Sequence, residues 1–415
     1  MKKTVKILIF FIILLILFFL VYYKESRQEK KVDPNNIIEI SVIDKYNKIK
    51  EIHENPEEEK YVLVDVIIDG IKYKDCGIRT KGSVIYESLK KYKIENYSYK
   101  IKLDYRNKNQ KYKGMNELYI NSSVYDATGI KEYLIYDIYN KMGIETQNYS
   151  LGHLKLGNVD RGLVTIVEVI NENFIQKKYN CDDGNLYKPE ADIILMKYDG
   201  ADLKYAGEDF TSYEGIFRKT KTNRTTLKDK KRLINIVKNI NNSSSTKVIE
   251  ENFMDFDKII KLVAINKVLA NIDTFTTQTA RNYYIYEKNG KIDILVFDFD
   301  LSLSFYVNAS YWKQNINEFD LSKDDEKIYS RITEIILQNE EYLNKYYQYI
   351  EQTLLVFQDI ENDDTVQNLY EKTKDLVKAN EKSIFSYGNY KTEIKELKRF
   401  IINRGNDYEN FKASN

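Results

Sequence analysis

The fold is decided by the stretch Asn271-Ile-Asp-Thr-Phe-Thr-Thr-Gln-Thr-Ala-Arg-Asn-Tyr-Tyr-Ile-Tyr286, which is followed after one short apolar run by Val296-Phe-Asp-Phe-Asp300. It places Asp273 and Asn282 around the start of one predicted strand, and an Asp-x-Asp pair at the end of the next. Phosphoryl transfer needs one carboxylate to orient an attacking hydroxyl, together with oxygen ligands for a Mg²⁺ ion on the phosphates. The rest of the chain must then supply a nucleotide pocket.

Asp298 and Asp300 are predicted to share one face of an extended segment, because alternate residues of a strand point the same way. Two carboxylates in that position suit Mg²⁺ or Mn²⁺. The preceding run 292–297 is apolar, and a carboxylate pair at the end of a buried strand is costly unless positive charge neutralises it. A surface turn is the alternative interpretation, but the apolar strand favours a metal site, with the Asn282 amide as a further ligand.

A buried helix is predicted between Asp255 and Ala270, where apolar residues recur at helical spacing. Asp273 follows this helix directly, at the end where the helix dipole disfavours a negative side chain. An Asp, then an Asn, then a metal-binding Asp is also the chain order of protein kinases. Asp273 is therefore the candidate catalytic carboxylate.

Cations precede this region in a form that suits phosphate oxygens. The run Arg79-Thr-Lys-Gly-Ser83 is predicted to be a strand that enters a Gly-Ser turn between positive side chains. Lys100 lies on a later strand, where a kinase places the lysine that pairs with the phosphates. Lys102 points to the same face, so the sequence leaves it open as an alternative.

Two lobes are predicted from the distribution of strand and helix patterns. Residues 37–189 are strand-rich, with hairpins turning at Gly70 and around Gly157, and an amphipathic helix over 126–142. Residues 190–415 carry the buried helix and, beyond about Asp324, a long charged helical region. The predicted class is α+β, with an N-lobe over 37–189 and a C-lobe over 190–415.

The first 23 residues are predicted to be a membrane anchor. Residues 7–23 form an unbroken apolar run that ends in charge rather than in a small-residue cleavage site, which favours an uncleaved transmembrane helix over a signal peptide. Residues 24–36 are polar and are interpreted as a tether. Positive charges flank both ends of the anchor, and we favour the orientation that places the domain outside the cytoplasm.

Composition argues against several classes of site and partner. The net charge of +1 argues against a dedicated nucleic-acid binder, which usually carries a large positive excess. His53 and His153 are the only histidines, which gives little support to a His-based triad or a His-rich metal site. Cys76 and Cys181 do not form a metal-ligand spacing. Carboxylates and Asn must carry any metal chemistry, and no nucleic-acid partner is expected.

These residues together resemble the spore coat protein H (CotH) family of atypical protein kinases, over roughly residues 60 to 305. The markers in chain order are Arg79-Thr-Lys-Gly-Ser83, Ser98-Tyr-Lys-Ile-Lys-Leu103, Asn121 before the helix with Glu132, Gly162–Glu168, Asp183–Lys188 and the two stretches quoted above. The resemblance implies a two-lobed, kinase-like fold that transfers phosphate from ATP to Ser residues of spore coat proteins.

The resemblance also implies roles for the acidic stretch. Asp273 matches the catalytic Asp of the family, and Asp298 matches its metal-binding Asp. Asn282 and Asp300 are implied as secondary metal or support positions, with Mg²⁺ or Mn²⁺ as the ion.

On the nucleotide side, the resemblance implies Lys100 as the phosphate-binding lysine. By analogy with kinases, Glu132 on the amphipathic helix is expected to pair with it. Glu168 falls where the chain would pass the adenine, and Lys188 is a further nucleotide-side candidate. The other cofactor-binding candidates belong to the phosphate turn: Arg79, Lys81, Gly82 and Ser83.

Three candidate functions are compatible with these sequence features. The first is a membrane-anchored, metal- and ATP-dependent protein Ser/Thr kinase that acts on Ser-rich proteins of the spore coat or envelope. The alternative is a catalytically inactive, nucleotide-binding structural protein of the spore coat. A metal-dependent glycosyltransferase ranks last, because no doubly wound βαβ pattern surrounds the Asp-x-Asp pair. Two departures from the family, the direct Gly82-Ser83 junction and the long spacing between Asp273 and Asn282, bear on activity more than on fold.

Overall fold

The computed structural model describes residues 32–414 except 83–85, 87, 88, 90–93, 182, 193–196, 244, 278, 304–318, 324–330 and 381. The predicted membrane anchor and most of the predicted tether lie outside the described residues. Among the helices that are described, none combines the length and apolar character needed to cross a membrane.

The N-terminal part is a closed barrel of antiparallel hairpins with one parallel pair. Its strand order is β1-β2-β3-β4-β5-β7-β6, and β6 closes the barrel by pairing in parallel with β1. Alternating apolar residues such as Val64, Val66 and Ile68 are buried in the barrel core. The strands are β1 (Ile38–Ile43), β2 (Val62–Ile68), β3 (Ile71–Lys81), β4 (Ser98–Lys102), β5 (Glu117–Asn121), β6 (Tyr149–Leu156) and β7 (Val159–Glu168).

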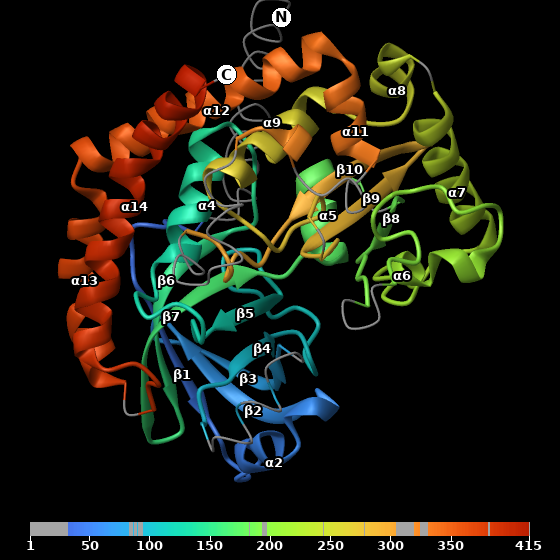
Figure 1. Cartoon of the computed structure of the whole chain (residues 1–415). Helices are drawn as coiled ribbons and strands as arrows, with labels where there is room; N and C mark the ends of the chain where they lie inside the picture. Colours follow the sequence, from blue (N-terminus) through green and yellow to red (C-terminus); the bar gives the residue numbers. More distant parts are fainter. Residues whose placement is uncertain are drawn as a thin grey trace, which may run out of the picture.

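The C-terminal part is helical and surrounds a small antiparallel sheet, as Figure 1 shows. The sheet has the order β10-β9-β8, with β8 (Asn185–Tyr187), β9 (Tyr283–Lys288) and β10 (Lys291–Val296). The helices among its described residues are α5 (Glu172–Tyr179), α6 (Glu214–Phe217), α7 (Leu227–Asn242), α8 (Thr246–Asn252), α9 (Phe256–Val268), α11 (Arg331–Gln338), α12 (Glu340–Asn362), α13 (Thr365–Ala379) and α14 (Tyr387–Ser414). The predicted α+β class, strand-rich and then helix-rich, is confirmed.

The described residues of the N-terminal part also form the helices α2 (Ile49–Glu54) and α4 (Lys131–Lys141). The helix predicted over 126–142 is α4, but its first turn starts five residues later than expected. The reason is a local turn: the Asp126 carboxylate accepts hydrogen bonds from the backbone N–H groups of Thr128 (2.8 Å) and Lys131 (3.0 Å). Side-chain oxygens of Asp that bond nearby backbone donors compete with helix formation.

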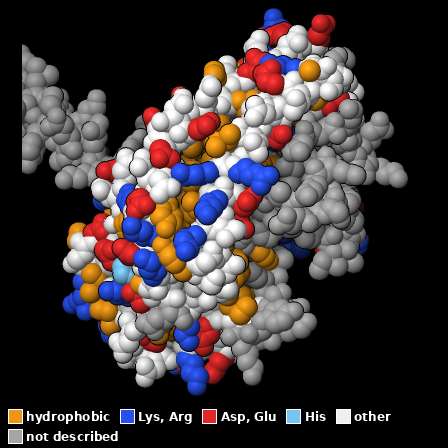
Figure 2. All heavy atoms as spheres, turned by 60° about the vertical axis from the view of Figure 1, so that its left-hand side comes forward, with side chains coloured by type: hydrophobic (Ala, Val, Ile, Leu, Met, Phe, Trp, Pro, Cys, Tyr) orange, Lys and Arg blue, Asp and Glu red, His pale blue; other side chains and the backbone are white. Residues whose placement is uncertain are grey.

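The charged C-terminal helices pack on the rest of the molecule. Apolar side chains of α14, including Tyr390, Leu397 and Ile401, are buried in the largest core cluster. The outward face is mixed in charge: Figure 2 shows Lys and Arg interspersed with Asp and Glu, with apolar patches between them, on the side where α13 and α14 lie. Pairs such as Lys378–Asp375 (3.0 Å) are one turn apart and contribute little stability individually.

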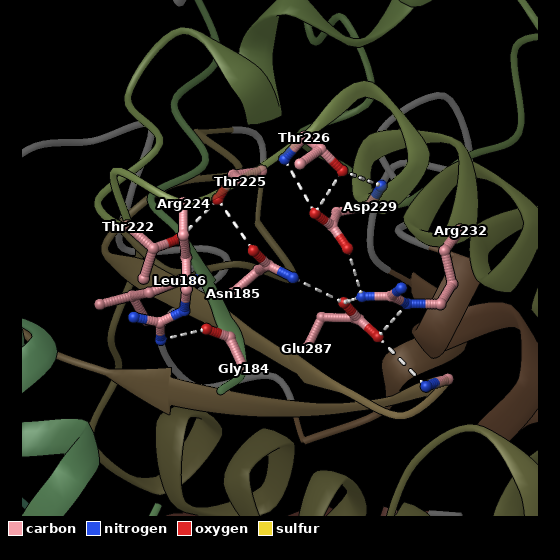
Figure 3. A network of polar contacts seen from close by, with 11 residues as sticks. Gly184, Asn185, Leu186, Thr222, Arg224, Thr225, Thr226, Asp229, Arg232 and Glu287 are labelled. Atoms are coloured by element: carbon pink, nitrogen blue, oxygen red, sulfur yellow. Dashed lines mark hydrogen bonds and ion pairs between the residues drawn. The ribbon is translucent and has the colours of Figure 1, made fainter. Parts of the chain in front are cut away.

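A buried ion pair joins α7 to the small sheet (Figure 3). Glu287 of β9 is fully buried, and both its carboxylate oxygens accept hydrogen bonds from Arg232 of α7, at 2.7 and 2.6 Å. The start of α7 is fixed by a capping box between Thr226 and Asp229. Since β9 begins next to Asn282, this contact holds the strand that leads out of the candidate site.

Replacing Arg232 with methionine is expected to destabilise the fold by about 2–3 kcal/mol, because the buried Glu287 carboxylate would lose its charged partner. Urea unfolding of the purified variant measures this. The exposed Lys228→Met on the same helix is the control and should change the free energy of unfolding by less than about 0.5 kcal/mol. Equal values for the two variants would show that the Arg232–Glu287 pair contributes no net stability.

Candidate active site

Asp273 lies in a tightly fixed loop after α9. The helix ends at Val268, and Ala270, two residues beyond it, has a left-handed φ of 50°. The Asn271 amide then donates to Asn266 Oδ1 at 2.7 Å. Asn271 Oδ1 accepts the backbone N–H of Asp273 at 3.0 Å. Asp273 is consequently buried, with its carboxylate held in one position.

The Asp273 carboxylate is bound by two neighbours from the same loop. Arg281 donates from Nε to Oδ1 at 2.6 Å and from Nη2 to Oδ2 at 2.7 Å, a bidentate ion pair. The Asn282 amide nitrogen donates to Oδ2 at 2.9 Å and to the Asp273 carbonyl at 3.0 Å. The structure therefore brings the Asn282 amide to Asp273 and adds Arg281, which was not among the candidates from the sequence.

The Asp-x-Asp segment is anchored by the residue in its middle. Phe299 is buried against the rings of Tyr136 and Tyr139 on α4, with ring centroids 5.0 and 5.2 Å apart. Asp298 has a left-handed φ of 61°, a conformation that costs energy and persists where the surroundings enforce it. The backbone N–H of Phe297 donates to the Asn282 carbonyl at 3.1 Å, which joins the two acidic stretches.

Lys81 reaches the acidic stretch from the end of β3. Its Nζ donates to Asn121 Oδ1 at 2.6 Å and lies 3.9 Å from Asp298 Oδ2. The Asn121 amide in turn donates to Glu132 Oε2 at 2.7 Å, so a chain of polar contacts links the barrel, α4 and the Asp-x-Asp segment. Burial lowers the pKa of Lys81, but the charges of Asp298 and Glu132 outweigh this and raise it. The lysine is therefore positive in this position.

Lys100 is engaged elsewhere, and the expected Lys100–Glu132 pair is not formed. Lys100 of β4 lies 2.5 Å from the Glu117 carboxylate, which also accepts from Lys102 at 2.8 Å. The register of the barrel explains this, because β4 pairs with β5 and sets Lys102 opposite Glu117. Glu132 instead belongs with Asn121 and Lys81, and Asn121, a family marker by sequence, becomes part of the site.

A group of cations surrounds Tyr119 of β5. The Nζ atoms of Lys81 and Lys100 lie 4.8 and 5.9 Å from the centre of its ring. Burial raises the pKa of Tyr119, but the charges of Lys100, Lys188 and Lys81 outweigh it and lower the pKa. Lys188 also pairs with Glu190 at 2.8 Å. Three lysines around one polar ring give a positive region suited to polyphosphate oxygens.

The other candidates are placed as follows. Arg79 pairs with Glu59 and donates to the Thr80 carbonyl at 2.8 Å. Gly82 is exposed with a φ of 100°, while Ser83 lies outside the described residues. Glu168, at the end of β7, is buried and pairs with Lys177, and it also accepts from the Asn148 amide at 2.6 Å.

The sequence profile described as CotH kinase protein matches residues 78–408, which is well over half of the chain. This chain belongs to the CotH kinase family. Membership of the family implies a kinase and the use of ATP. The matched range contains both acidic stretches, the lysines around Tyr119 and most of the C-terminal helices. A search of curated proteins gave no match.

The donor set of this CotH kinase consists of oxygen atoms. Among the described residues, no group of three or more His, Cys, Asp or Glu side chains could hold a metal ion without other ligands. Mg²⁺ in nucleotide sites is usually held by one or two carboxylates, with phosphate oxygens and water completing the octahedron. Asp298 and Asp300 fit that role, because burial and the charge of Asp298 raise the pKa of Asp300 to about 7. A dication would neutralise this excess of negative charge.

The raised pKa of Asp300 predicts an unusual pH dependence. The unfolded carboxyl titrates near 3.8 and the folded one near 7, so the folded protein binds this proton more tightly. Stability should therefore fall as pH rises from about 4 to about 7, and metal binding should strengthen over the same range. In the metal-free protein, the titration of Asp300 should by itself make the melting temperature at pH 8 at least about 3 °C lower than at pH 5.

Thermal melts of the wild type and Asp300→Asn at both pH values measure the contribution of Asp300. The variant should lose most of the difference, since its amide does not titrate. Identical pH dependence in the two proteins would contradict the raised pKa.

A residue far along the chain of this CotH kinase contacts the end of α9, just before the loop that carries Asp273. Arg404 of α14 is fully buried and donates to the carbonyls of Val268 (2.9 Å) and Lys267 (2.6 Å), at the end of α9. Its guanidinium lies 4.2 Å from the centre of the Phe319 ring. A cation at a helix C-terminus satisfies free carbonyls and favours the dipole. No local sequence signal marks Arg404, which looks like one more charge on a long helix.

Proposed function

We propose that this CotH kinase is a Mg²⁺- or Mn²⁺-dependent protein Ser/Thr kinase that phosphorylates Ser-rich proteins of the spore coat or envelope. The observation that carries the proposal is the convergence of four separate segments on one place: the loop with Asp273, the segment with Asp298, the end of β3 with Lys81 and α4 with Glu132. This is the set of groups that phosphoryl transfer requires.

The roles follow from the contacts. Asp273 accepts a hydrogen bond from the substrate hydroxyl and takes its proton. The hydroxyl oxygen bonds to the γ-phosphorus, the bond from that phosphorus to the bridging oxygen breaks, and ADP leaves with the electron pair. Lys81 binds phosphate oxygens, and the charges of Lys100 and Lys188 near Tyr119 add to the positive potential around them. A divalent cation held by Asp298 and Asp300, with Asn282 nearby, would supply further charge neutralisation.

Location and partners are part of the same proposal. The apolar run 7–23 supports attachment to a membrane by a single N-terminal helix, with the kinase domain outside the cytoplasm or at the spore envelope. A net charge of +1 and a mixed surface support a protein substrate rather than nucleic acid.

One observation favours the alternative of a nucleotide-binding protein without turnover. Both oxygens of Asp273 already accept hydrogen bonds from Arg281, which occupies lone-pair positions that a substrate hydroxyl would use. Such a protein would bind ATP and leave a substrate hydroxyl unmodified.

The test is transfer from radiolabelled ATP to a Ser-rich peptide by the purified full-length chain in mild detergent, with Mg²⁺ or Mn²⁺. We expect labelled peptide with the wild type and none above background with Asp273→Asn. ATP binding by both proteins without any transfer would instead establish the scaffold. Transfer that persists in the variant would remove Asp273 from the mechanism.

A further inference from the structure

We propose that Arg281 is a further catalytic residue, whose guanidinium contacts the phosphoryl group in transfer while it holds Asp273. This inference rests on the proposed kinase function and adds to it a residue supplied from the same loop as the catalytic Asp. Arginine suits the role because its planar set of donors can bind a carboxylate and a phosphate oxygen at once.

The donors of Arg281 are only partly used. Nε and Nη2 bind the two oxygens of Asp273, and among the described residues Nη1 has no hydrogen-bond partner. The Arg281 side chain is 20% exposed, so it is not sealed off from a ligand. Burial lowers the pKa of Arg281, but the bond to Asp273 and the charges of Asp273 and Asp298 raise it, which places the guanidinium near both acidic stretches.

The acceptors of Asp273 leave room for one more donor. A carboxylate offers about four lone-pair positions. Among the residues that the structure describes, Oδ2 accepts from Arg281 and from Asn282, whereas Oδ1 accepts from Arg281. A substrate hydroxyl can therefore bind Oδ1, directly beside the guanidinium. A phosphoryl group approaching that hydroxyl arrives within reach of Arg281.

The backbone around Arg281 is held in an unfavourable conformation. Ala280 before it and Asn282 after it have left-handed φ angles of 42° and 60°. For alanine this region is sterically costly, and such strain gathers at functional sites. The residues on both sides of Arg281 thus adopt costly backbone conformations, and these conformations set the direction of the Arg281 side chain.

Two simpler roles predict different behaviour. If Arg281 only positions Asp273, its loss would disturb the carboxylate without changing affinity for a phosphoryl group. If it is an inhibitory latch, its loss would free Asp273 and raise activity. The experiment must therefore measure both turnover and binding of a transition-state mimic.

The test uses full-length Arg281→Ala and Arg281→Lys, with the exposed Arg218→Ala as matched control. Kinetics with ATP, Mg²⁺ and a Ser-rich peptide should show kcat lowered about 10²–10³-fold in Arg281→Ala, with the KM for ATP within about threefold of the wild type. Added guanidinium ion should restore part of the activity to Arg281→Ala, and to no other variant.

Calorimetry gives a second, activity-independent measurement. The wild type should bind ADP with aluminium fluoride and Mg²⁺ at least about tenfold more tightly than ADP and Mg²⁺ alone, because the fluoride complex mimics the phosphoryl group in transfer. Arg281→Ala should lose this gain and keep its affinity for ADP. Unchanged or higher kcat, or a retained fluoride gain, in Arg281→Ala would overturn the role of Arg281. A wild type that shows neither transfer nor fluoride gain would overturn the kinase proposal itself, and this inference with it.

Discussion

Asp298→Asn is expected to lower kcat/KM for phosphate transfer by at least about 10³-fold and leave the fold intact, because it removes the carboxylate that faces Lys81 and that would hold the divalent cation. Asparagine is the informative choice at this position. The φ of Asp298 is 61°, a conformation that Asn tolerates and alanine resists, so Asp298→Ala would mix chemistry with strain. Stability should be unchanged or slightly raised, since the variant removes one of the negative charges that crowd Asp300.

Kinetics and thermal melts with and without Mg²⁺ and ATP measure these effects. The matched control is Asp75→Asn, a second Asp in the left-handed region (φ 55°), which lies on β3. The control should keep activity within about twofold of the wild type and keep the stabilisation by Mg²⁺ and ATP. Asp298→Asn should lose that stabilisation. A normal rate in Asp298→Asn would exclude Asp298 as the metal-binding carboxylate.

Lys81→Met is expected to be the most damaging of the lysine substitutions. Methionine keeps the apolar stem but removes the charge that lies 3.9 Å from Asp298, so the KM for ATP should rise at least about tenfold and kcat should fall about 10²-fold. Lys100→Met should be milder, within about fivefold in kcat/KM, because Lys100 is held by Glu117.

Parallel steady-state kinetics of the two variants decide between the lysines. The opposite order would assign phosphate binding to Lys100, as the family resemblance alone implied. Asn121→Ala should resemble a weak form of Lys81→Met, because it removes the amide that positions Lys81 Nζ at 2.6 Å.

Local patterns in the sequence were sufficient to predict the elements that flank Asp273 and Asp298, the acidic half of the site. Asn289-Gly290, a dipeptide typical of hairpin turns, lies between β9 and β10. The predicted buried helix between Asp255 and Ala270 is α9, as expected. These elements are continuous in sequence, and their periodicity and turn residues are strong. The positions of Asp273 and Asp298 follow from them.

The sequence could not show in the same way which lysine lies next to the acidic residues. Alternation shows that Lys100 and Lys102 share a face of their strand, but the twist and closure of the barrel decide which lysine reaches Asp298. Closure depends on the parallel pairing of β1 with β6, between residues more than a hundred positions apart, such as Ile38 and Gly152. No local pattern encodes such a pairing. Only the complete barrel shows that Lys81 is the lysine that lies close to Asp298.

Because Arg404 contacts the end of α9, the loop that carries Asp273 gains its full support only late in the synthesis of the chain. Proteins emerge from the ribosome N-terminus first, and the loop that carries Asp273 is made long before residue 404. Until α14 is complete, the carbonyls of Lys267 and Val268 lack their buried donor. A nascent chain can therefore contain every acidic residue of the site while the loop still lacks its support. Phosphate transfer would then be withheld until nearly the whole chain has been translated.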